Sequence, residues 1–154
     1  MFGGVQVNLK NMKRQTNKGF TLIELLVVIA IIGVLASVVL VSLNSSRMKS
    51  RNARRVADIR QIMTALELFY NDNYRYPSAT SGVPTAADGS PAWNTFMKTW
   101  PLNPTPQNDG SCSAAEYAYT QTGSGTGYVI TFCLGAQTGG YSAGSHTLTP
   151  AGIQ

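Results

Sequence analysis

The chain has 154 residues and carries twelve basic side chains against seven acidic ones, for a net charge of +5. This length allows one globular domain of modest size. A basic balance can accompany nucleic-acid binding, but four of the twelve basic residues precede residue 20, which leaves eight bases against seven acids in the remainder. The rest of the chain is therefore close to neutral, and its composition gives no reason to expect a nucleic-acid-binding protein.

The first nineteen residues are polar and basic, and a 24-residue apolar run follows at 20–43. A helix needs about 20 apolar residues to span a bilayer. Because no small-residue cleavage site follows the run, we expect it to be retained as a membrane anchor. Glu24 lies inside this run, where a carboxylate costs about 2.5–3.5 kcal/mol. We therefore expect Glu24 to have a partner.

Helical periodicity continues through residues 44–73. Apolar side chains recur on one face, and polar ones occupy the other. The apolar stripe consists of Val56, Ile59, Ile62, Met63, Leu66, Phe69 and Tyr70. Since no proline occurs before Pro77, the sequence predicts one continuous helix from residue 20 to about residue 73.

Residues 74–154 are rich in Gly, Ser, Thr and Pro and predict a small, loop-rich β domain. A short helical turn is expected within 92–100. Two strands, at 117–121 and 128–134, flank a glycine-rich turn and predict an antiparallel hairpin; a further strand is expected around 146–149. The fold class is α+β, with the long N-terminal helix packed on a small antiparallel β-sheet.

Both cysteines, Cys112 and Cys133, lie beyond the apolar run. Such a pair suits a disulfide in an oxidising compartment outside the cytoplasm. Two buried thiols are the alternative.

The segment from residue 18 reads K-G-F-T-L-I-E-L-L-V-V-I-A-I-I-G. It resembles the class III signal of type IV pilins and type II secretion pseudopilins. The resemblance implies a pilin-like fold, a leader at 1–19, cleavage by prepilin peptidase between Gly19 and Phe20, and N-methylation of Phe20. It also implies that Glu24 neutralises the Phe20 amine of a neighbouring subunit and so sets the register of the filament. The eight residues from Met12 to Gly19 would form a shorter leader, so the true start is either Met1 or Met12.

The resemblance implies a structural subunit, and no catalytic constellation points to an enzyme. Our first interpretation is a type IV pilus-like filament built by pilus or secretion assembly machinery from many copies of the chain. The alternatives are a type II secretion pseudopilin, which forms a short periplasmic pseudopilus, and a DNA-binding competence pilin. In each case the chain would cross the cytoplasmic membrane once before assembly. It would then become part of an extracellular pilus or a periplasmic pseudopilus.

A basic cluster follows the apolar run and consists of Arg47, Lys49, Arg51, Arg54 and Arg55. It could capture DNA, because clustered cations bind phosphate. We favour pairing with Asp58, Glu67 or Asp72 of a neighbouring subunit, and the other alternative is a collar that faces lipid headgroups. No aromatic residues interleave the cluster, so we do not expect nucleic-acid stacking.

Calcium is the one cofactor left open. Asp109, with Asp88 and Asn108, offers a weak site, since Ca²⁺ prefers six to eight oxygen ligands. A turn at 108–111 is the better interpretation of these residues. The single histidine, His146, is expected to be a surface imidazole rather than a zinc ligand.

Overall fold

The computed structural model describes residues 19–113 and 115–154. Residues 1–18 of the expected leader at 1–19 lie outside these residues, and so does the choice between Met1 and Met12. The chain divides into two compact units, the first ending at Leu40 and the second running from Val41 to Gln154. Each is described by itself.

Helix α1 spans Leu22–Asn73, 52 residues without a break, as the absence of proline predicts. It begins after Thr21, whose side chain accepts a hydrogen bond from the Glu24 N–H at 3.3 Å. It ends at Asn73, because Tyr74 adopts a left-handed conformation with φ of 55°. The predicted helix, from 20 to about 73, is confirmed.

The second unit contains a four-stranded antiparallel sheet in the order β3-β4-β5-β6. Its strands are β3 (Ala118–Thr122), β4 (Gly127–Leu134), β5 (Gly144–Thr149) and β6 (Gly152–Ile153). The expected hairpin is the β3–β4 pair, joined by the short 3-10 helix η1 (Gly123–Gly125). The strand expected around 146–149 is β5.

Three short elements complete the unit: β1 (Ala79–Thr80), β2 (Val83–Pro84) and α2 (Trp93–Phe96). The helical turn expected within 92–100 corresponds to α2. The sequence did not predict β1, β2 or β6, because a two-residue strand is too short to show an alternating pattern.

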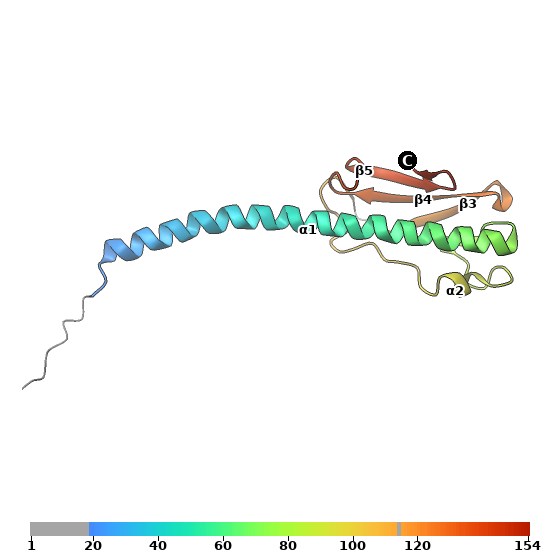
Figure 1. The fold of residues 1–154 in the computed structure, drawn as a ribbon, viewed down its shortest axis with the longest axis horizontal. Helices are drawn as coiled ribbons and strands as arrows, with labels where there is room; N and C mark the ends of the chain where they lie inside the picture. Colours follow the sequence, from blue (N-terminus) through green and yellow to red (C-terminus); the bar gives the residue numbers. More distant parts are fainter. Residues whose placement is uncertain (1–18, 114) are drawn as a thin grey trace, which may run out of the picture. The chain divides into compact units, whose positions relative to one another are not determined.

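The core lies between the sheet and the second half of α1 (Figure 1). Alternate side chains of β4 are buried, as expected for a strand with one covered face. They pack with the helix stripe in one cluster, whose largest apolar members include Ile59, Ile62, Leu66, Phe69, Ile130, Phe132 and Leu134. The predicted stripe is confirmed at its centre, whereas Met63 is only partly buried and Tyr70 is exposed. The α+β fold follows from this packing.

Candidate functional site

The N-terminal end of α1 presents Phe20 and Glu24, the residues to which the sequence resemblance gives a role. Phe20 is 86% exposed. The Glu24 carboxylate accepts hydrogen bonds from the Thr21 N–H at 2.8 Å and from the Thr21 hydroxyl at 2.7 Å. Together with the bond from the Glu24 N–H to the Thr21 hydroxyl, this arrangement is a capping box that starts the helix.

Glu24 therefore has a partner within its own chain. We expected a partner for Glu24 only in a neighbouring subunit, although the T-L-I-E at 21–24 matches the capping-box pattern of a threonine followed three residues later by a glutamate. The cap leaves the carboxylate exposed, so a second partner can still reach it.

The apolar side chains of the segment that follows are exposed. They include Leu26, Ile29, Ile32, Leu35, Val38 and Val41. The helix is long and apolar enough to cross a membrane, and its most apolar stretch has no buried residue. Since exposed apolar surface of this extent marks contact with lipid or with other proteins, this segment is a binding surface.

The structure separates the basic cluster into exposed and internal members. Arg47, Lys49 and Arg54 are exposed, whereas Arg51 binds Asp109 through two parallel hydrogen bonds, from Nε at 2.6 Å and from Nη2 at 2.9 Å. Such a bidentate pair holds both side chains in one geometry. Arg51 is therefore part of the packing between the helix and its own domain.

Arg55 is fully buried, so its inclusion in an accessible cationic patch was wrong. Its guanidinium donates to Asn103 Oδ1 at 2.8 Å and to Asn52 Oδ1 at 2.6 Å, and it lies 3.6 Å from Asp109 Oδ2. A buried charge is tolerated only with such partners. The helical pattern did not reveal it, since an arginine on the border of an apolar stripe is normally solvated.

Asp109 is brought to the helix by a close approach of two glycines. A Cβ at Gly110 would lie 2.0 Å from the Gly135 carbonyl oxygen, and a Cβ at Gly135 would lie 2.2 Å from the Asp109 carbonyl oxygen. Gly110 also has a φ of +58°, which favours glycine. The hydrogen bond from Arg51 lowers the pKa of Asp109 below its ordinary value, in opposition to burial, so the carboxylate stays ionised.

A disulfide cross-links the region around Asp109. Cys112 and Cys133 are joined at 2.04 Å, across a sequence separation of 21. The expected pairing is confirmed. Because the Cys112 N–H also donates to the Asp109 carbonyl at 3.1 Å, the covalent link and the Asp109 ion pairs stabilise one corner of the domain.

This corner does not fit a calcium ion. Both Asp109 oxygens accept from Arg51, so a cation already occupies the position that Ca²⁺ would take. Asp88 is likewise bound by Arg75, at 2.6 and 2.8 Å, and by the Ser78 N–H. Within residues 19–113 and 115–154 no three His, Cys, Asp or Glu side chains gather as a metal site.

His146 is buried, and its expected place on the surface was wrong. Its ring stacks on Phe132 at 5.5 Å between centroids, and its two nitrogens lie 3.2 Å from the Gln154 carbonyl and 2.9 Å from the Ser142 carbonyl. The imidazole therefore serves packing inside the domain, and it lies in the cross-strand pair Phe132–His146 of β4 and β5.

Residues 14–40 match the family model of the prokaryotic N-terminal methylation motif. The chain is 42% identical over 72 residues to type II secretion system core protein G of Klebsiella michiganensis, which covers 47% of this chain and 51% of that relative. It is 35% identical to core protein G of Aeromonas hydrophila and 34% identical to that of Pseudomonas aeruginosa, in each case over 101 residues, 60% of this chain and 71% of the relative. The chain thus spans about half the length of the Klebsiella relative. No solved structure matches it significantly.

The motif covers the segment in which Gly19, Phe20 and Glu24 lie, and the longer alignments continue beyond it. The long helix on a small antiparallel sheet is the fold that the resemblance implied. The chain belongs to the pilin and pseudopilin family, among the relatives of type II secretion system core protein G.

Proposed function

We propose that this chain is a pseudopilin, a structural subunit that assembles into a short periplasmic pseudopilus of a type II secretion system. The observation that carries the proposal is the apolar segment of α1, which has no buried residue in its most apolar stretch and yet follows a prepilin-type motif. Such a surface suits lipid before assembly and other helices afterwards.

The relatives support this pseudopilin alternative over the type IV pilus subunit, our first interpretation of the sequence, since the three relatives described above are named as type II secretion system proteins. The competence-pilin alternative loses support, because Arg51 and Arg55 of the cationic cluster are engaged within the domain. Deleting the chain from its host would test the choice. A pseudopilin predicts loss of secreted enzymes from the medium, whereas intact secretion with loss of surface filaments would overturn it.

Under this proposal, prepilin peptidase cuts between Gly19 and Phe20 and methylates the new amine. The domain organisation is then a leader at 1–19, a membrane and filament-core helix at 20–43, an amphipathic continuation at 44–73 and a β domain at 74–154. Gly19→Phe should leave the precursor uncut, as measured by the mass of the membrane-bound chain. Normal cleavage of this variant would place the processing site elsewhere.

Glu24 has two roles to separate: the cap on Thr21 and the attraction to a neighbour's Phe20 amine. Gln at this position can still form a capping box, but it carries no charge. We therefore expect Glu24→Gln to be inserted and cleaved normally yet to assemble poorly, whereas Thr21→Val removes the two hydroxyl bonds of the cap, keeps the Glu24 charge and should assemble. Ser37→Val, a polar-to-apolar change in the same segment, serves as the control. Normal assembly of Glu24→Gln would show that Glu24 acts only as a helix cap.

A further inference from the structure

Three cations near the start of the second half of α1 have no firm partner in their own chain. Arg47 and Lys49 are exposed, and in the part of the chain that the structure describes neither makes an ion pair. Arg54 is 69% exposed and approaches Asp58 only to 4.0 Å. Asp58 is partly covered and accepts a hydrogen bond from the Tyr117 hydroxyl at 3.2 Å, so it is a weak partner for a cation. These three positive charges are available to a partner outside the domain.

The same cations follow closely on the uncharged stretch of the helix. Residues 25–43 contain no charged side chain, and these nineteen residues make about 28 Å of helix, against about 30 Å for the hydrocarbon core of a bilayer. Measured along the axis from Leu43, Arg47 and Lys49 lie about 6 and about 9 Å beyond this stretch. The headgroup layer adds about 5–8 Å on each side of the hydrocarbon, and helical side chains tilt toward the N-terminus, which is back toward that layer. Both charged groups can therefore reach the level of the lipid phosphates.

Arg47 and Lys49 lie on opposite sides of the helix. Two residues correspond to a rotation of about 200°, and the domain covers neither side chain. A straight partner such as a neighbouring helix or duplex DNA runs along one side, so it would reach one of these two cations but not both. A membrane surface surrounds the helix that crosses it, and its headgroups meet cations on every side. The arrangement around the axis therefore favours lipid over a rod-shaped partner.

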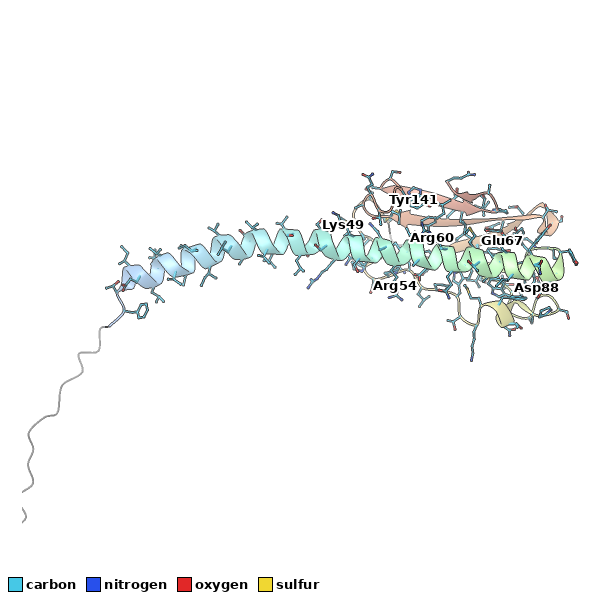
Figure 2. The ribbon with its side chains drawn as sticks, in the orientation of Figure 1. Lys49, Arg54, Arg60, Glu67, Asp88 and Tyr141 are labelled. Atoms are coloured by element: carbon cyan, nitrogen blue, oxygen red, sulfur yellow. A yellow bond between two sulfur atoms is a disulfide. The ribbon has the colours of Figure 1, made fainter. Side chains whose placement is uncertain are left out.

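The exposed charges are also sorted along the helix in the order that an anionic surface requires. Figure 2 shows Lys49, Arg54, Arg60 and Glu67 in this order along α1. The exposed acids Glu67 and Asp72 lie about 36 and about 44 Å beyond the apolar run along the axis. Because salt screens exposed charges beyond about 8–10 Å, an anionic membrane attracts the cations at the near end of this part of the helix and does not repel the acids at its far end.

The acids of the domain that lie nearest to the cations do not oppose this attraction. Both Asp109 oxygens accept hydrogen bonds from Arg51, which neutralises the carboxylate. Glu116 accepts a hydrogen bond from the Asn103 N–H at 2.9 Å, and the Asn103 side chain in turn accepts from Arg55, about 18 Å beyond the apolar run. Glu116 is therefore held at a level farther from the membrane than the first cations of the helix.

We propose that Arg47 and Lys49, assisted by Arg54, bind the phosphate groups of anionic phospholipids while the chain is in the membrane. Arg47 and Lys49 make direct contact, whereas Arg54, about 16 Å beyond the apolar run, acts over a longer distance. Arg60, at about 25 Å, lies outside the range of the headgroup charge. The contact holds the near end of the domain at the membrane surface and is broken when the chain leaves the membrane for a filament. The inference depends on the membrane span and not on the type of filament.

The lipid selectivity of the full-length chain in vesicles tests the proposal. The chain is reconstituted in phosphatidylcholine vesicles with a trace of spin-labelled phosphatidylglycerol or of spin-labelled phosphatidylcholine, and electron spin resonance measures the fraction of each label immobilised at the protein. We expect a preference for the anionic label that disappears at high salt. Arg47→Gln/Lys49→Gln should lower this preference at least about threefold, since each cation near the surface contributes up to about fivefold. Equal immobilisation of the two labels by the unmodified chain would overturn the proposal.

Matched variants test the dependence on distance from the membrane. Arg60→Gln/Lys98→Gln removes the same number of charges at exposed residues, one farther along α1 and one outside it, and should leave the preference unchanged. Arg54→Gln should lower it by less than the double variant of the two nearer cations. Every variant keeps the expected leader, whose cations therefore contribute equally to all of them, and folding is checked by the fluorescence melt of the two tryptophans. Equal losses in the two double variants would show that net charge, and not these positions, selects the lipid.

Other partners for the cations give different results. If Arg47→Gln/Lys49→Gln keeps the lipid preference but assembles less than the unmodified chain, the cations pair with acids of a neighbouring subunit and the lipid proposal is wrong. If the unmodified chain shows no lipid preference but is retained on duplex DNA through the same two residues, they bind nucleic acid instead. Intact secretion in a host that lacks the chain, together with the expected lipid preference, would contradict the proposed function and leave the lipid contact standing.

Discussion

The two halves of α1 are both rich in Leu, Ile and Val, but only one of them is covered by its own chain. Leu26 in the first half is 54% exposed, whereas Leu66 in the second half is fully buried against the sheet. The first half is apolar on every side, and the second is apolar on one side only. One side can be covered by a small domain, and a fully apolar surface needs lipid or several neighbouring helices.

The two halves of α1 differ in what covers their apolar side chains. The second half is completed by strands β3 to β5 and by the polar contacts of Arg51 and Arg55. The first half has no such strand, and its capping box organises only the first turn. Changes in the second half should therefore alter folding, whereas changes in the first should alter insertion and assembly.

The largest expected effect is at Arg55. Arg55→Met removes a buried charge, leaves Asn103 Oδ1 without its donor and leaves Asn52 Oδ1 with only the Gly135 N–H, so it should lower the free energy of unfolding by about 3–5 kcal/mol. Its neighbour Arg54 is 69% exposed, and Arg54→Met should cost no more than about 1 kcal/mol. Denaturant unfolding of the full chain in detergent, followed by Trp fluorescence, measures both. Equal losses would show that the Arg55 contacts do not stabilise the domain.

Leu66→Ala and Leu26→Ala compare the two halves directly, with the same atoms removed. Leu66→Ala should cost about 2–5 kcal/mol, because it leaves a cavity in the core. Leu26→Ala should leave the unfolding of the domain within about 0.5 kcal/mol. The same denaturant titration distinguishes them. A large loss in Leu26→Ala would mean that the first half is part of the cooperative unit.

Removal of the disulfide should have a somewhat smaller effect. Cys112→Ser/Cys133→Ser opens a loop whose ends are 21 residues apart, and we expect a loss of about 3 kcal/mol. Membrane insertion should be unchanged, because both cysteines lie in the second unit. Carbonate extraction measures insertion, and thermal melting with and without reductant measures the stability. An unfolding free energy equal to that of the unmodified chain would contradict the expectation.

The smallest expected effect is the loss of folding free energy at low pH, which involves the two carboxylates that are hydrogen-bonded to arginine side chains. Hydrogen bonds from Arg51 and Arg75 lower the pKa values of Asp109 and Asp88. Their contribution is present above the unfolded pKa of Asp, about 3.9, and is lost as pH falls through the lower folded value. Asp109→Asn should therefore flatten the loss of stability below about pH 4, as measured by urea unfolding at a series of pH values.

Asp58 should act in the opposite sense. Burial raises its pKa, so its contribution to stability grows as pH falls and offsets part of the loss from Asp109 and Asp88. Asp58→Asn should therefore make the free energy of unfolding fall more steeply as the pH is lowered below about 4. If the free energy of unfolding instead fell less steeply in this variant, as expected for Asp109→Asn, the pKa of Asp58 would be lowered by folding rather than raised.

The elements with long, regular patterns could be predicted from sequence. The 52-residue helix, its buried stripe and the β3–β4 hairpin all follow from periodicity and from the positions of proline and glycine. The arrangement around Asp109 could not be predicted, because Arg51 and Asp109 are 58 residues apart and no local pattern records such a contact. The capping box at Thr21 and Glu24 is different, since its pattern lies within four consecutive residues and can be recognised in the sequence.

The sequence by itself determined the anchor, the motif that carries Gly19, Phe20 and Glu24, and the helix with its apolar stripe, because these depend on neighbours within a few residues. Only the tertiary structure decided which cations are accessible. It buried Arg55 and engaged Arg51 with Asp109, and it left Arg47, Lys49, Arg54 and Arg60 exposed. The physical reason is that a charge can be buried only where a distant segment supplies a partner for it. The position of that segment depends on the packing of the whole domain.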